Sequence, residues 1–386
     1  MFNFDFKNPT KLIFGRDTIQ RISQEIPHGS KVLLLYGAGS IKQNGVYDEV
    51  VNALSGFSYI EFGGIPPNPE YDVLCEALQI IKSQEINYLL AVGGGSVIDG
   101  TKFLAAAAYY TGDNTWEILE KGIRTDVAMP FGTVLTLPAT GTEMNSGAVI
   151  SRRKTFQKLG MGGPGLFPQF SILDPSVVRS IPSHQIANGI TDAFTHVLEQ
   201  YMTYPIQARL QDRFSESILQ TLIEVSTSVI SNPENHEAAS DYMWSCTMAL
   251  NGLIQKGVPT DWGIHAIGHE LTVLFGIDHA RTLAIITPNY YRYCFESKKQ
   301  KLAQCATRVF GIHEGSIEEK AIACIFHIET FFHSLGIATK LSAYTDNYIG
   351  TAEHIQSRFT DRGLLGIGEH KLIAPEDVKN IVGMCY

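Results

Sequence analysis

The segment INYLLAVGGGSVIDG, residues 86–100, decides the fold of this 386-residue chain. An apolar run rich in leucine and valine passes directly into three glycines, and a helical pattern follows. A strand that leads through a glycine turn into a helix is the repeating unit of an open parallel sheet. Two more apolar runs, KVLLLYGAGS at 31–40 and FGTVLTLPAT at 131–140, also end in small residues. Amphipathic stretches such as 71–84 lie between these runs, so the first half predicts a parallel sheet covered by helices.

The second half of the chain has a different pattern. The segments SHQIANGITDAFTHVLEQYMT and RLQDRFSESILQTLIEVSTSVI show apolar residues three and four apart, without the alternation of strands. The boundary is expected near PSVVRSIP, residues 175–182. The sequence therefore predicts an α/β domain with a Rossmann-like, dinucleotide-binding parallel sheet over 1–178 and an all-α domain over 179–386. The site is expected in the cleft between the two domains, because small molecules often bind between domains.

Composition and charge exclude several classes of protein. Apolar residues make up 44% and charged residues 18%, as in ordinary globular proteins. The net charge of −9 argues against nucleic acid as the main partner, because phosphate binding needs a basic surface. No apolar run reaches the roughly 18–20 residues that span a bilayer, and the N-terminus does not resemble a secretory signal. The six cysteines form no C-x-x-C pair, so we expect reduced thiols and a cytoplasmic protein without a membrane partner.

Histidines and one aspartate in the second half have the spacing of metal ligands. Asp192 and His196 are four residues apart within a helical pattern, as are His265 and His269, and His279 follows after a glycine. Residues four apart lie on one face of a helix, where both side chains can reach one ion. A single such pair more often forms a hydrogen bond along its helix. Two pairs and a further histidine in one domain favour a site for a divalent metal, Fe²⁺ or Zn²⁺.

The segments around these histidines resemble a known family. GITDAFTHVLEQY and GIHAIGHELTVLFGIDHARTLAIITP are similar to the two signature regions of the iron-containing (group III) alcohol dehydrogenases. DHARTLAIITP and the GAGS turn most resemble the branch of NADPH-dependent aldehyde reductases and butanol dehydrogenases. The resemblance implies one divalent metal, bound by Asp192, His196, His265 and His279. It also implies that His269 lies near the substrate and is not a primary ligand. Ala280 departs from the glycine that many members carry after the last histidine.

The glycine turn of the first segment is a candidate cofactor loop. Its glycines allow backbone N–H groups and a helix N-terminus to face a pyrophosphate, although the G-x-G-x-x-G fingerprint is absent. A tight turn without a ligand is the alternative. GGGSVIDGTK resembles the family element GGGSxxDxxK. The resemblance implies that Gly94, Gly95 and Ser96 hold the pyrophosphate and that Asp99 lies near the nicotinamide. Lys102 is expected to be a residue of the helix face rather than a direct contact.

Further cofactor contacts are expected in three other places. LPATGTEMNSGAVI, 137–150, resembles a second family element and supplies hydroxyl and amide groups with the residue before it. The candidates there are Thr136, Thr140, Thr142 and Asn145. Lys158 matches a family lysine beside the cofactor ribose, and Asn68 matches a loop on the cofactor side. A polar turn without ligand, a solvated lysine and a turn asparagine before proline are the respective alternatives.

The turn YGAGS indicates which dinucleotide binds. Some family members carry an aspartate after the first strand, where a carboxylate would repel the 2′-phosphate of NADP(H). This chain has Gly37, Gly39 and Ser40 there, and Lys42 adds positive charge if it points inward. We therefore predict NADP(H) rather than NAD(H).

These observations predict a metal-dependent oxidoreductase that transfers a hydride between NADP(H) and a primary alcohol or aldehyde, as a butanol dehydrogenase or a broad aldehyde reductase does. His269 is the candidate proton relay, and Asp99 is the candidate catalytic group beside the nicotinamide. Two alternatives stay open: a metal-dependent lyase similar to dehydroquinate synthase, and a dinucleotide-binding protein without catalysis. The segment FNFDFKNPTKLIFG alternates as an edge strand, from which we predict a homodimer.

Overall fold

The computed structural model describes all 386 residues, which divide into two compact units. The α/β unit comprises residues 7–182 and 232–251, and the helical unit comprises residues 1–6, 183–231 and 252–386. The segment 232–251, which the sequence analysis assigned to the all-α domain, groups instead with the α/β unit.

A six-stranded sheet forms the centre of the α/β unit, and every neighbouring pair of its strands is parallel. The strand order is β1-β8-β5-β4-β2-β3. The bounds are β1 Lys11–Phe14, β2 Lys31–Tyr36, β3 Ser58–Phe62, β4 Tyr88–Gly94, β5 Phe131–Leu137 and β8 Phe170–Leu173. A hairpin of β6, Gly147–Arg152, and β7, Gln157–Gly162, forms a second sheet.

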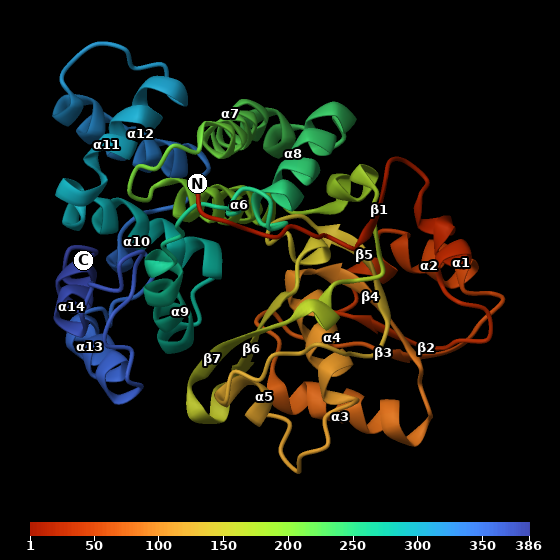
Figure 1. Cartoon of the computed structure of the whole chain (residues 1–386). Helices are drawn as coiled ribbons and strands as arrows, with labels where there is room; N and C mark the ends of the chain where they lie inside the picture. The colour runs from red at the N-terminus through yellow and green to blue at the C-terminus, as the bar shows by residue number, and fades with distance from the viewer. The chain divides into compact units, whose positions relative to one another are not determined.

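The helices of this unit pack around its two sheets. Their bounds are α1 Ile22–Glu25, α2 Val46–Ala53, α3 Tyr71–Ser83, α4 Gly95–Ala107, α5 Glu117–Glu120 and α8 His236–Ala249. Helix α4 packs on β4, the strand that precedes it, as Figure 1 shows. Strands β2, β4 and β5 are buried over most of their length, which explains their continuous apolar runs. The parallel α/β fold predicted from these runs is confirmed.

The N-terminal strand is shorter than the sequence pattern suggested. Only Lys11–Phe14 form β1, at the edge of the sheet, and the ten residues before it have no regular structure. Pro9 lacks a backbone N–H, and the side chain of Asn8 accepts a hydrogen bond from the amide of Thr10. These two residues separate the alternating N-terminal phenylalanines from the strand.

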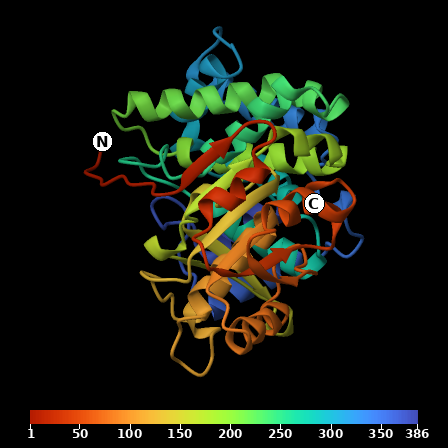
Figure 2. The ribbon, with the colours of Figure 1, turned by 90° about the vertical axis from the view of Figure 1, so that its right-hand side faces the viewer.

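The helical unit consists of helices joined by short loops. Their bounds are α6 Ser183–Tyr201, α7 Arg209–Ser231, α9 Gly263–Phe275, α10 His279–Tyr293, α11 Phe295–Arg308, α12 Ile317–Ser334, α13 Thr351–Asp361 and α14 Pro375–Gly383. Helix α10 packs against α6, α9, α12 and α14, and its residues 282–291 are all buried. Figure 2 shows the long α7, which packs on α6. None of the helices combines the length and the apolar character needed to cross a lipid bilayer.

Candidate metal centre and cofactor loops

Three helices of the helical unit present the predicted metal ligands. Helix α6 carries Asp192 and His196 one turn apart, and both side chains are buried. Helix α9 carries His265 in its first turn and ends at Gly276, whose φ of +68° suits glycine. The chain then turns, so that α10 begins at His279. The glycine that ends α9 and the turn after it therefore bring the start of α10, with His279, back toward α6 and α9.

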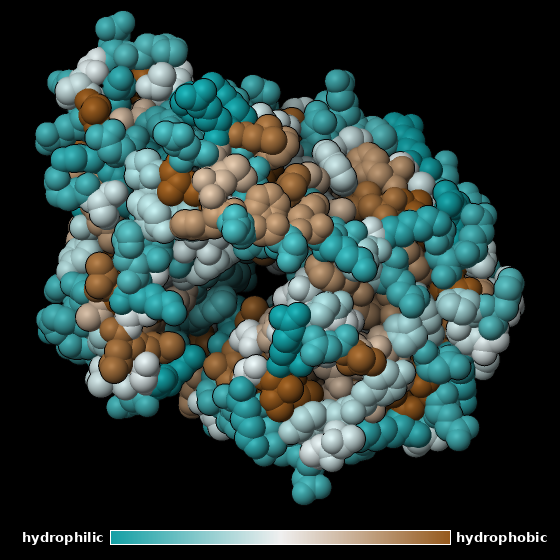
Figure 3. Space-filling view, viewed as in Figure 1, coloured by the Kyte–Doolittle hydropathy of each residue, from teal (hydrophilic) through white to brown (hydrophobic).

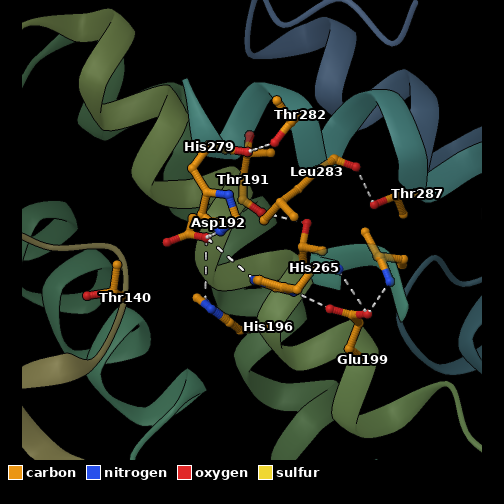
Figure 4. A network of polar contacts seen from close by, with 12 residues as sticks. Thr140, Thr191, Asp192, His196, Glu199, His265, His279, Thr282, Leu283 and Thr287 are labelled. Carbon is orange, nitrogen blue, oxygen red and sulfur yellow. Dashed lines mark hydrogen bonds and ion pairs between the residues drawn. The ribbon is translucent and has the colours of Figure 1, made fainter. Parts of the chain in front are cut away.

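The carboxylate of Asp192 lies at the centre of this group. Its Oδ1 has three ring nitrogens at nearly equal distances, which are 3.8 Å to His196 Nδ1, 4.0 Å to His265 Nε2 and 3.9 Å to His279 Nε2. Two ligands that each lie about 2.1 Å from a tetrahedral ion are about 3.4 Å apart, close to these separations. Figure 4 shows the side chains converging on Asp192.

This arrangement fits a divalent cation. Asp192 Oδ1 is buried and accepts no hydrogen bond from the protein. A buried carboxylate oxygen without a donor is costly unless a cation satisfies it. Asp192, His265 and His279 offer ligand atoms that all lie within 4.8 Å of one another. His196 is next to this group, because its Nδ1 lies 3.8 Å from Asp192 Oδ1. Its ring also stacks on that of His265, with centroids 4.6 Å apart.

His269 lies beside this group. Its ring centroid is 4.8 Å from that of His279 and 6.2 Å from that of His265, and the residue is half-buried. It is one turn beyond His265 on α9, on the same helix face. His269 therefore lies next to the ligand group, and its expected place near the substrate stays a prediction.

The predicted cofactor turns of the α/β unit lie at the carboxyl ends of neighbouring strands. Gly37 follows β2, and Gly94 and Gly95 connect β4 to α4. The chain leaves β2 toward β3 on one side, whereas β4 lies on the other side of β2 and leads to β5. Such a reversal of strand order is where open α/β sheets bind their ligands. Gly39, with a φ of +101°, allows the sharp turn before Ser40, which is exposed.

Small side chains are required where these loops approach each other. A Cβ atom on Gly95 would lie 2.7 Å from Thr140 Oγ1, and one on Gly94 would lie 2.8 Å from the Cβ of Leu137. The glycine turn at 93–96 therefore lies directly against the segment 137–150, at Leu137 and Thr140. Thr136 is half-buried near the end of β5.

Hydrogen bonds connect most of the other predicted cofactor residues. Ser96 Oγ accepts from the amide of Asn68 at 3.2 Å, and Lys158 Nζ donates to Asn68 Oδ1 at 2.9 Å. Thr142 Oγ1 donates to Asp99 Oδ1 at 2.6 Å, and the amide of Val149 donates to Asp99 Oδ2 at 2.9 Å. Burial raises the pKa of Asp99, while the charge of Lys102 and these hydrogen bonds lower it.

Lys102 has a structural role that its position on a helix face does not reveal. It lies on α4 as expected, but its side chain is fully buried. Its Nζ donates to Thr142 Oγ1, Asn145 Oδ1 and the carbonyl of Gly147, at 2.7, 2.9 and 2.7 Å. Burial lowers the pKa of Lys102 to about 8. The lysine therefore holds the loop 142–147 against the helix that follows the glycine turn.

Lys42 was expected to add positive charge to the turn after β2 if its side chain pointed inward, but it lies beside a carboxylate and two aromatic rings. Its Nζ is 3.3 Å from Glu61 Oε2 and lies over the rings of Tyr36 and Tyr47. Tyr47 also donates to Glu61 Oε1 at 2.5 Å. Part of the positive charge of Lys42 is therefore offset by a carboxylate.

Family models match nearly the whole chain. The model described as iron-containing alcohol dehydrogenase matches residues 9–175, and the model of the C-terminal domain of the Fe-containing alcohol dehydrogenase family matches residues 186–382. The chain belongs to the iron-containing alcohol dehydrogenase family. The resemblance found in the signature segments is thus confirmed, together with the prediction of a metal-dependent alcohol or aldehyde oxidoreductase.

Individual members of the family are similar over most of their length. The chain is 48% identical over 346 residues to the NADPH-dependent aldehyde reductase YqhD of Escherichia coli (strain K12), covering 89% of each protein. It is 41% identical over 389 residues to the probable NADH-dependent butanol dehydrogenase 1 of Bacillus subtilis (strain 168), covering 99% of each. The crystal structure of E. coli YqhD matches with a TM-score of 0.98 at 44% identity, over 100% of this chain and 99% of that one.

Proposed function

We propose that this family member is an NADP(H)-dependent aldehyde reductase whose metal is bound by Asp192, His196, His265 and His279. The observation that carries the proposal is the buried Asp192 Oδ1 with three imidazole nitrogens at 3.8–4.0 Å. One carboxylate and three imidazoles suit both Fe²⁺ and Zn²⁺. The similarity to an aldehyde reductase and to butanol dehydrogenases supports short and medium aliphatic aldehydes, or the matching primary alcohols, as substrates.

The residues of the helical unit have three roles in this proposal. A divalent ion, when bound, supplies the positive charge that stabilises the developing alkoxide of the substrate. Asp192 and the three histidines fix its position, and the burial of Asp192, His196 and His265 excludes water from that side. His269 is the proposed proton relay, because it is half-buried beside His279 and imidazole exchanges protons near neutral pH.

The residues of the α/β unit bind and orient the dinucleotide, which carries the hydride. The backbone at Gly94, Gly95 and Ser96 faces the pyrophosphate in this proposal, at the N-terminus of α4. Asp99 accepts hydrogen bonds from Thr142 and Val149 through both oxygens, so it orders the loop that would face the nicotinamide. Gly37, Asn68, Thr136, Thr140, Asn145 and Lys158 complete the proposed cofactor contacts.

The preference for NADP(H) rests on the turn after β2. Gly37, Gly39 and Ser40 place no carboxylate there, and the exposed Ser40 hydroxyl can donate to a 2′-phosphate. The relatives named above differ in this respect, because one is NADPH-dependent and another is described as NADH-dependent. A kcat/KM for NADH equal to or above that for NADPH contradicts this part of the proposal.

The test of the proposed function combines metal analysis with an aldehyde panel. The purified protein is assayed for iron and zinc, stripped with a chelator and reloaded with each ion. Oxidation of NADPH by butanal and related aldehydes is then followed by the loss of NADPH absorbance. Aldehyde-dependent oxidation that is lost on stripping and restored on reloading supports the proposal. Full turnover in the stripped protein, or no turnover with either ion, contradicts it.

We also propose a homodimeric, cytoplasmic protein. Phe2, Phe4 and Phe6 alternate along the N-terminal segment and are all about half exposed. Figure 3 shows apolar side chains among polar ones on the surface, and exposed phenylalanines are suited to burial between two copies. The six cysteines are all thiols, which suits a reducing compartment. Sedimentation that shows only monomers contradicts the dimer.

A further inference from the structure

Glu199 is a buried carboxylate in direct contact with one of the proposed metal ligands. It lies on α6 one turn beyond His196 and is fully buried. Its Oε2 contacts Nδ1 of His265, as Figure 4 shows. Its Oε1 accepts hydrogen bonds from the amides of Ile264 and His265, at 2.7 and 3.4 Å. One carboxylate therefore contacts both the backbone and the ring of the same histidine.

The backbone contacts have a structural explanation. The first amides of a helix have no partner within the helix. Helix α9 begins at Gly263, after Trp262 with a φ of +64°, and no side chain of the preceding residue caps it. Asp261 Oδ1 accepts from the amide of Gly263 at 2.9 Å, and Glu199 supplies the acceptor for the next two amides from another helix. This contact fixes the start of α9 against α6.

The ring contact has a consequence for metal binding. A neutral imidazole carries a proton on one nitrogen and a lone pair on the other. A carboxylate that accepts from Nδ1–H of His265 leaves the lone pair on Nε2. That nitrogen is the one that faces Asp192, at 4.0 Å from its Oδ1. A carboxylate behind a histidine also fixes the ring plane and increases the basicity of the ligand.

We propose that Glu199 is a positioning residue, which selects the tautomer and orientation of His265 that bind the metal. The inference rests on the metal site of the proposed function and adds a residue that the spacing of ligands does not reveal. Its hydrogen bonds couple the N-terminus of α9 to the ligand group, so that helix position and metal affinity depend on the same carboxylate.

Replacement of Glu199 by glutamine separates this role from simple capping. Glutamine keeps the size of the side chain but has one oxygen and one NH₂ group. If the oxygen faces the amide of Ile264, the NH₂ group faces His265 Nδ1 and favours the tautomer that protonates Nε2. If the oxygen faces Nδ1, the NH₂ group meets the amide N–H of Ile264. No orientation of the amide satisfies both sides.

The measurement is the affinity for Zn²⁺ of the full-length, chelator-stripped protein, determined by competition with a chromophoric chelator. We expect Glu199→Gln to weaken binding about 10- to 100-fold, the usual effect of losing such a partner of a ligand. Visible absorption of the Co²⁺-loaded variant is a second measurement, and we expect a spectrum that differs from wild type. Unchanged Zn²⁺ affinity in a folded variant would overturn the proposal, even if its melting temperature falls.

The matched control is Glu216→Gln. Glu216 is also a buried carboxylate of the helical unit and accepts from Tyr201, Arg213 and Arg308, without contact to a metal ligand. We expect the control to keep wild-type Zn²⁺ affinity. A loss equal to that of the Glu199 variant would show a general effect of destabilisation and would overturn the proposal.

Two further variants keep the outcomes distinct. If Glu199→Gln does not fold, Glu199→Asp is compared with Glu216→Asp, and only the former is expected to weaken Zn²⁺ binding. Asp192→Asn tests the site itself. If Asp192→Asn loses Zn²⁺ binding and the Glu199 variants keep wild-type Zn²⁺ affinity, only the positioning role is rejected. Unchanged binding in Asp192→Asn rejects the metal site of the proposed function.

Discussion

Replacement of Lys102 by methionine tests whether the buried lysine organises the cofactor loop. The change removes the donor to Thr142, Asn145 and the carbonyl of Gly147, together with a positive charge that lowers the pKa of Asp99. Methionine fills a similar volume but leaves buried acceptors without a donor. A buried acceptor left without a donor costs about 1–3 kcal/mol, so the three acceptors together cost about 3 kcal/mol or more. We therefore expect a free energy of unfolding lower by about this amount.

The assays for this variant are thermal unfolding and NADPH binding followed by cofactor fluorescence. A loss of 1 kcal/mol lowers the melting temperature of a domain of this size by about 2–4 °C, so a decrease of about 6 °C or more is expected. The dissociation constant for NADPH should rise, because the loop 142–147 loses its attachment to α4. Lys82→Met is the control, since Lys82 is an exposed lysine on α3. A variant whose stability and NADPH affinity both stay at wild-type values would refute the reasoning.

Four further outcomes are expected. The stability difference between wild type and Lys102→Met should grow as the pH rises from about 8 to 10.5, since the folded protein has then lost a proton that the unfolded chain keeps; equal differences at pH 7 and pH 10 would contradict this. Ser40→Asp should lower the NADPH/NADH ratio of kcat/KM about 5-fold or more, because a carboxylate beside the 2′-phosphate costs at least about 1 kcal/mol; an unchanged ratio in steady-state kinetics with both cofactors would contradict this. His269→Ala should lower kcat and alter the pH–rate profile, whereas an unchanged kcat and profile reject the relay. Gly95→Ala should raise the KM for NADPH, because its Cβ would lie 2.7 Å from Thr140 Oγ1, and an unaltered KM would show that the turn adapts.

The fold was predictable where its elements have a local apolar pattern. The runs that became β2, β4 and β5 are buried on both faces in a parallel sheet, so the pattern and the structure have the same physical origin. The place of residues 232–251 was not predictable in this way. Helix α8 joins the α/β unit through contacts far apart in sequence, such as the hydrogen bond from Tyr242 to the carbonyl of Pro138. No periodicity within the helix indicates its partner.

In the candidate site, too, residues with a local sequence pattern were predictable and residues that depend on tertiary contacts were not. The spacing of Asp192 and His196 on one helix, with further histidines later in the chain, favoured a metal site, because helix geometry fixes which side chains share a face. The choice of His265 and His279 as ligands came from the family resemblance. Glu199 was not identified, since a glutamate three residues after a histidine is common on solvated helices. Its role depends on burial against the start of α9, and burial is a tertiary property. Lys102 was underestimated for the same reason.

The most direct test of the central claim is the metal content of the purified wild-type protein beside that of Asp192→Asn, measured by elemental analysis together with aldehyde reduction. The account predicts one Fe²⁺ or Zn²⁺ per wild-type chain, and an Asp192→Asn variant that is folded but has lost both the metal and the activity. The buried Oδ1 and its three neighbouring nitrogens are the reason for this expectation. An Asp192→Asn variant that retains a full equivalent of metal and wild-type turnover would contradict it.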